Sequence, residues 1–174
     1  MDLVRDINFK TEDKDTGRLV YLFGALLMLG IWALGFEPIF YQGYNLLSIP
    51  ALPIVVVIHE ALHGLLFLTW AGKVKFGFIN SYIGPSFYST SLGACFSKNQ
   101  FLAIALIPQL LTLACLLIFY FVSIQTLWIK YFILNIAAVN LSGGCSDFYI
   151  IYVLLDQKNN IRVEDYIEGV RIWA

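Results

Sequence analysis

Four long apolar stretches dominate the pattern of hydrophobic and polar positions along the chain. They cover residues 19–36, 49–70, 101–124 and 127–155. Each is close to or longer than the ~20 residues that a helix needs to cross the hydrocarbon core of a bilayer. Pro108 lies inside the third stretch and predicts a kink, while the polar and glycine-rich segment 140–144 interrupts the fourth. The pattern therefore predicts an all-α membrane protein with four transmembrane helices.

A different pattern separates the second and third stretches. Polar and apolar residues alternate from Lys73 to Phe78, Gly84-Pro85 is typical of a turn, and aromatic residues recur as far as Phe96. This combination predicts a cytoplasmic β-hairpin between helices 2 and 3. Two roles fit such a hairpin: its edge strand could receive an unfolded peptide by strand addition, or its aromatic side chains could anchor it at the lipid headgroups.

Composition supports the membrane interpretation. The 174 residues are 59% hydrophobic and 13% charged, with a mean hydropathy of +0.75, whereas an ordinary soluble domain carries about 25% charged residues. We expect one polytopic membrane domain over residues 1–174, with the lipid bilayer and a peptide or membrane protein as its partners. The net charge of -1 gives no general attraction to nucleic acid. The sequence leaves the oligomeric state open.

Basic residues orient the predicted spans. Ten of the eleven lysines and arginines precede the first stretch, lie in the 71–100 connection or follow the fourth stretch, and Lys130 is the exception. The positive-inside rule makes that side cytoplasmic. Residues 1–18 hold nine charged side chains of both signs, so no cleavable signal peptide is indicated. We therefore expect a multi-pass protein of the cell membrane, of the bacterial plasma-membrane type, with both termini in the cytoplasm.

The second stretch carries both histidines of the chain, in the sequence His59-Glu60-Ala61-Leu62-His63. Four residues correspond to about 400° around a helix, so both imidazoles project from nearly the same face. This is the spacing at which two imidazoles bind Zn²⁺, and a catalytic site adds a third protein ligand and a water molecule. Glu60 flanks this face and could act as the general base that takes the proton of that water. Cobalt, iron or manganese could occupy the same ligands.

The best candidate for the third ligand is Asp147 in the fourth stretch. His63 lies seven residues before Trp70, and Asp147 lies eight residues before Leu155, so the two side chains are matched in depth. An ionisable residue inside a span costs about 2.5 to 3.5 kcal/mol unless it is compensated, and a shared cation would compensate it. Cys145 is the alternative ligand, because a thiolate also binds zinc.

Two further residues are candidates for substrate binding. Asn140 could hold a substrate carbonyl or strand, although an interhelical hydrogen bond or a helix cap would equally explain a buried amide there. Tyr88, in the predicted hairpin, could donate a hydrogen bond to the reacting group. No spacing rule supports the role of Tyr88.

These motifs resemble those of known membrane peptidases. The His-Glu-x-x-His turn in a spanning helix, the hairpin after it and Asn140 followed by Asp147 are similar to intramembrane metalloproteases of the site-two protease type. The whole chain more closely resembles a small bacterial membrane family of unknown function whose members are described as zincin peptidases. The resemblance implies zinc-dependent hydrolysis of a peptide bond in or beside the membrane, with His59, His63 and Asp147 as ligands and Glu60 as the base.

Two other classes of function remain open from the residues alone. A metal transporter or sensor also uses histidines and carboxylates in adjacent spans. Such a protein would be expected to carry further polar residues along the membrane normal, whereas the polar residues here form one layer. A non-catalytic membrane protein could bind a partner through the hairpin, but binding alone would not need Glu60.

Overall fold

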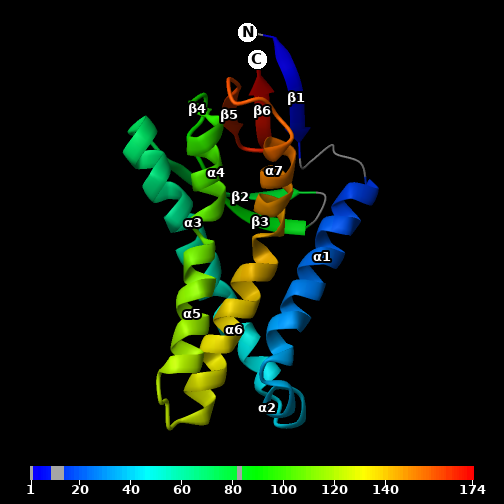
Figure 1. Ribbon diagram of the computed structural model, residues 1–174, viewed down its shortest axis with the longest axis vertical. Helices are drawn as coiled ribbons and strands as arrows, with labels where there is room; N and C mark the ends of the chain where they lie inside the picture. Colours follow the sequence, from blue (N-terminus) through cyan, green and yellow to red (C-terminus); the bar gives the residue numbers. More distant parts are fainter. Residues whose placement is uncertain (1, 9–13, 82–83) are drawn as a thin grey trace. The chain divides into compact units, whose positions relative to one another are not determined.

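The computed structural model describes residues 2–8, 14–81 and 84–174. Figure 1 labels the α-helices and β-strands in chain order. The elements are β1 (Leu3–Asn8), α1 (Lys14–Ala33), α2 (Phe36–Tyr41), the 3₁₀ helix η1 (Tyr44–Leu47), α3 (Ser48–Ala71), β2 (Lys75–Ser81), β3 (Gly84–Thr90), β4 (Cys95–Ser97), α4 (Lys98–Leu106), α5 (Gln109–Phe121), α6 (Leu127–Gly143), α7 (Cys145–Leu155), β5 (Arg162–Tyr166) and β6 (Gly169–Trp173). The chain divides into two compact units. The sheet unit comprises residues 1–20, 60–107 and 146–174, and the helical unit comprises residues 21–59 and 108–145.

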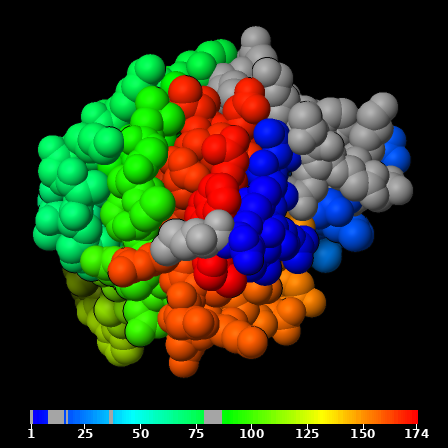
Figure 2. Space-filling model, turned by 90° about the horizontal axis from the view of Figure 1, so that it is seen from above, coloured from blue at the N-terminus to red at the C-terminus, as the bar shows by residue number. Residues whose placement is uncertain are grey.

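The sheet unit is built on a four-stranded antiparallel sheet with the strand order β1-β6-β5-β4. Figure 2 shows β1, in blue, alongside β6, in red. Asp2 and Ala174 continue this pairing by exchanging two backbone hydrogen bonds. The sequence of β5 and β6 explains the strands, because Val163, Val170 and Ile172 fall on the buried face while charged residues alternate with them.

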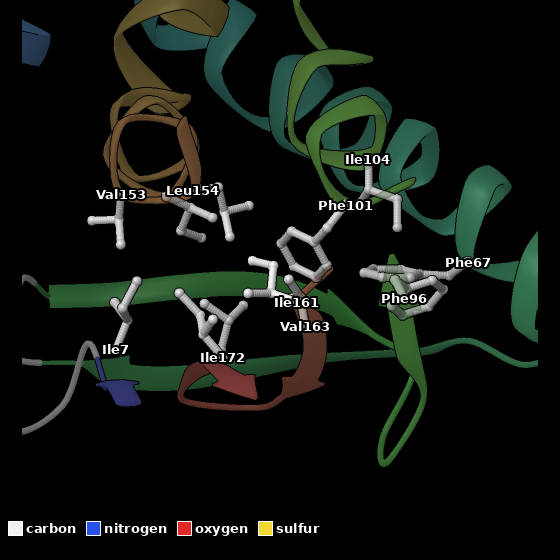
Figure 3. Close-up of a cluster of buried hydrophobic side chains, with 12 residues drawn as sticks. Ile7, Phe67, Phe96, Phe101, Ile104, Val153, Leu154, Ile161, Val163 and Ile172 are labelled. Atoms are coloured by element: carbon white, nitrogen blue, oxygen red, sulfur yellow. The ribbon is translucent and has the colours of Figure 1, made fainter. Parts of the chain in front are cut away.

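A hydrophobic cluster covers the inner face of this sheet. Figure 3 shows Val153 and Leu154 of α7 against Ile7 and Ile172 of the strands, and the aromatic rings of Phe101 and Phe96 close to one another. The other members of the cluster are also buried: Phe67, Ile104, Ile150, Ile161, Val163 and Val170. The cluster fixes α4 and α7 on the sheet, and these two helices carry groups of the candidate site.

Strands β2 and β3 form a separate antiparallel hairpin in the sheet unit. Phe76 pairs with Ser89, Gly77 with Tyr88, and Phe78 with Phe87. The hairpin predicted between the second and third apolar stretches is therefore present. Gly84 and Pro85 belong to β3, and the turn itself, residues 82–83, lies outside the described residues.

The helical unit has a core of its own, formed by α5, α6 and the segment from α1 to η1. Asn135, fully buried in α6, uses its whole amide: it accepts from the Trp32 indole N–H and donates to the carbonyls of Tyr44 and Tyr131. Large apolar side chains point outward instead, including Phe121 at 80% exposure and Ile49 at 70%. Buried amides with exposed apolar side chains are the arrangement expected of helices in lipid.

The fold class predicted from the sequence is wrong in two respects. Within the described residues, two helices are long and apolar enough to cross a membrane, 44–71 and 98–121, or three if α6 and α7 count as one broken span. The first predicted span is too short, because the apolar part of α1, residues 18–33, is only about 24 Å long at 1.5 Å per residue. The protein is also not all-α, because the charged N-terminal segment and the C-terminal segment form the four-stranded sheet.

Candidate metal centre

Helix α3 carries His59, Glu60 and His63 on two successive turns. The helix is continuous from Ser48 to Ala71, and Gly72 ends it with a positive φ of 67°, the left-handed conformation that glycine adopts readily. Both histidines are buried, each with 8% exposure. Because both rings come from one continuous helix, the four-residue spacing places them on the same helix face.

The backbone carbonyl of Ile104 orients His63, and Pro108 makes this carbonyl available. A proline has no N–H, so the carbonyl four residues earlier, that of Ile104, receives no helical hydrogen bond from it. The Nδ1 atom of His63 lies 2.8 Å from this carbonyl oxygen. A carbonyl only accepts, so Nδ1 carries the hydrogen and the lone pair of the ring lies on Nε2.

Asn140 orients His59 in the same way. Its Nδ2 donates to the Pro108 carbonyl at 2.9 Å and to Thr112 Oγ1 at 2.8 Å, and its Oδ1 lies 3.1 Å from His59 Nδ1. Because the Pro108 carbonyl can only accept, the amide orientation is settled and Oδ1 must be the acceptor for His59. His59 therefore also presents its lone pair on Nε2. Metal-binding histidines typically have such a partner on the other ring nitrogen.

Asp147 lies in the first turn of α7, just after the helix break at Gly144. Its Oδ2 is 3.5 Å from His63 Nε2. Two ligands at about 2.1 Å from a tetrahedral zinc ion would be about 3.4 Å apart. One ligand atom from each of His59, His63 and Asp147 lies within 4.8 Å of the others. The three predicted ligands thus fit one metal ion by type, protonation and spacing.

Glu60 contacts Ser89, a residue that the sequence pattern did not single out. Its Oε2 accepts a 2.8 Å hydrogen bond from the hydroxyl of Ser89 on β3. Alternation along β3 could have shown that Ser89 and Phe87 share one face of the strand. It could not have shown that this face is the one turned toward Glu60.

The remaining candidates lie elsewhere. The Tyr88 ring covers Gly77, its cross-strand partner, so closely that a Cβ at that glycine would be 2.4 Å from the Tyr88 hydroxyl. Tyr88 also alternates with Ser89 and faces the other side of the hairpin. The thiol of Cys145 lies against α1, 3.1 Å from where a Cβ on Gly24 would stand. Roles for Tyr88 and Asn140 in binding substrate stay predictions.

A second residue missed from the sequence is Asp165, which shares the inner face of β5 with Val163. It is 6% exposed, and its Oδ2 accepts from the Thr90 hydroxyl and from the Ser91 backbone N–H. Burial raises the pKa of its carboxyl from 3.8 to about 6, against the opposing effect of these two hydrogen bonds. The carboxyl holds the end of β3 onto β5.

Two oriented imidazoles, an adjacent carboxylate and a glutamate between the histidines define the type of site found in zinc metallopeptidases. A family model described as "Putative zincin peptidase" matches residues 52–162, more than half of the chain. The chain belongs to this family, and membership indicates a metallopeptidase that uses zinc. No curated protein and no solved structure matches the chain.

Proposed function

We propose that this protein is a zinc-dependent endopeptidase that works within or beside a membrane. His59, His63 and Asp147 would hold the metal, and Glu60 would be the general base. The observation that carries the proposal is the pair of second partners, Ile104 for His63 and Asn140 for His59, which leave Nε2 of each ring as the ligand atom. Two histidines buried only for packing would not need a hydrogen-bond partner on Nδ1 and a lone pair on Nε2 in both rings.

Zinc, when bound, would polarise the peptide carbonyl and acidify water. The chain's own contribution is the movement of one proton. Glu60 takes the proton from the attacking water and gives it to the amine that leaves when the peptide C–N bond breaks. Glu60 lies between the two histidines in the sequence, so helix α3 alone fixes the base near the metal ligands.

The membrane setting rests on the helices. Two or three of them are apolar enough to span a bilayer, and large apolar side chains of the helical unit are exposed. We propose a multi-pass protein of the bacterial plasma membrane with both termini in the cytoplasm, which requires an even number of crossings. The pairing of β1 with β6 in one sheet and the basic residues near both ends support this proposal. The substrate would be a peptide or a membrane protein.

Metal analysis combined with cleavage tests the proposal. The full chain is purified in detergent, its zinc content is measured, and hydrolysis of fluorescein-labelled casein, an unfolded protein, is followed. We expect zinc and cleavage in the wild type, zinc without cleavage in Glu60→Gln, and neither in His63→Ala. Asp147→Ala should lose most of its zinc. Cleavage at the wild-type rate by Glu60→Gln would refute the role of the base, and full zinc occupancy in Asp147→Ala would remove Asp147 as a ligand.

A further inference from the structure

One face of helix α3 lies against the β2–β3 hairpin, within the sheet unit. Gly64 comes one helical turn after Glu60, so the two residues are neighbours on the helix surface. The Phe76 ring of β2 lies directly over Gly64, where a Cβ would be 2.6 Å from the ring Cζ. The absence of a side chain at Gly64 therefore allows the hairpin to approach the helix closely.

Phe76 and Ser89 form a cross-strand pair in the hairpin. Residues directly opposite each other in an antiparallel pair project from the same face of the sheet. Phe76 contacts the helix at Gly64 and Ser89 contacts it at Glu60, 2.8 Å from the carboxylate oxygen. The pair thus docks on two successive turns of α3, with one apolar and one polar contact.

The position of Ser89 is also fixed from the other direction along β3. The next two residues, Thr90 and Ser91, are each 1% exposed and donate to the buried carboxyl of Asp165 on β5. The backbone N–H of Asp165 in turn donates to the Ala94 carbonyl at 3.2 Å. Ser89 therefore lies between its own contact with the helix and the contacts of the next two residues with the four-stranded sheet, which restrict its movement.

We infer that Ser89 is a positioning residue for Glu60. This inference rests on the proposed role of Glu60 as the general base. The Ser89 hydroxyl donates to Oε2 and so holds the carboxylate plane in one orientation, while proton transfer to and from Glu60 requires a fixed orientation toward the attacking water. Ser89 itself exchanges no proton with the substrate. Its loss should reduce kcat and leave KM nearly unchanged, because the contact does not involve bound substrate.

The matched variants are Ser89→Ala, Ser89→Thr and Ser91→Ala. Ser89→Thr retains the hydroxyl and suits a strand position. Ser91→Ala removes a hydroxyl two residues away, whose Oγ is buried and has no hydrogen-bond partner among the described residues. With zinc-loaded full chain in detergent and labelled casein, we expect kcat to fall about tenfold or more in Ser89→Ala, since a hydrogen bond to a charged group is lost. Ser89→Thr should restore kcat, and Ser91→Ala should match the wild type.

A second measurement does not depend on cleavage. Hydrogen exchange of the segment 84–90, followed by mass spectrometry, should be faster in Ser89→Ala and in Glu60→Ala, and no faster still in the double variant, because both single changes break the same contact. Additive acceleration, or none, would overturn the contact. Wild-type kcat in Ser89→Ala beside inactive Glu60→Gln would overturn the positioning role alone. Full activity in Glu60→Gln, or an inactive wild type, would instead count against the proposed function.

Discussion

Asn140 offers the sharpest test of how the proposed metal ligands are oriented. Replacing it by alanine removes three hydrogen bonds from a side chain with 0% exposure. Two of its partners keep another bond, because the Pro108 carbonyl also accepts from the Leu111 backbone N–H and the Thr112 hydroxyl also donates to Gln109. The cost of Asn140→Ala therefore falls mainly on His59, which loses the acceptor that fixes its tautomer.

Two general magnitudes give the expected loss of zinc affinity in Asn140→Ala. A buried donor that loses its acceptor costs about 1 to 3 kcal/mol, and loss of a second partner of a metal-binding histidine typically lowers metal affinity about 10- to 100-fold. The two ranges agree, since a tenfold change corresponds to about 1.4 kcal/mol. We therefore expect Asn140→Ala to bind zinc 10 to 100 times more weakly than the wild type.

Asn135→Ala is the matched control. Asn135 lies in the same helix, is equally buried and also makes three hydrogen bonds, but to Trp32, Tyr44 and Tyr131 instead of a histidine. Both variants should lose comparable stability in a denaturant titration without metal. Zinc affinity, measured by competition with a chromogenic chelator, should fall only in Asn140→Ala. Equal zinc affinity in the two variants would refute the assignment of Asn140 as the partner of His59.

Three other predictions follow from the sheet unit. The folded pKa of Asp165, about 6, lies above its ordinary value of 3.8, so the folded state binds the proton more tightly and loses stability, by about 3 kcal/mol, as the pH rises through this window. Asp165→Asn should be flatter than the wild type in denaturant titrations between pH 4 and 6, and identical slopes would contradict the burial argument. Gly169 has a φ of 153°, and a Cβ there would lie 1.8 Å from the Ile7 carbonyl oxygen. Gly169→Ala should therefore lower the free energy of unfolding by about 3 kcal/mol or more. Gly30→Ala is the control and should not lower it, because a Cβ at Gly30 would meet nothing within 4 Å. Gly64→Ala should speed hydrogen exchange in β2, because the added Cβ displaces the Phe76 ring. Adding Phe76→Leu to this variant should partly reverse the effect. Unchanged exchange in Gly64→Ala would refute the close packing.

The sequence predicted the parts of the site that depend on local spacing. His59 and His63 are four residues apart, and a helix of any tertiary context would bring them to one face. Asp147 could be chosen by depth because the distance of a residue from the end of its predicted span can be compared between two spans in the same bilayer. The hairpin was recognisable because alternation and a Gly-Pro pair lie within one short segment.

The missed parts depend on contacts between distant residues. Leu3 pairs with Trp173 in the sheet, and the charged residues between the apolar positions of β1 gave no reason to expect a strand. Ser89 and Asp165 act through elements far away in the chain, and the pattern within each strand does not reveal what the strand faces. The first span was mistaken because its apolar composition continues past Ala33, where α1 ends before the short helix α2.

The pairing of β1 with β6 also sets an order of events during translation. About 160 residues separate Asn8 from its partner Gly169, and a ribosome that adds 5 to 20 residues per second needs roughly 10 to 30 seconds to make them. Throughout that interval β1 has no partner strand. The proposed metal ligands His59, His63 and Asp147 are all synthesised before Asp165, whose carboxyl holds the end of β3. The nascent chain therefore contains all three proposed metal ligands before it contains the strand that keeps Ser89 in place.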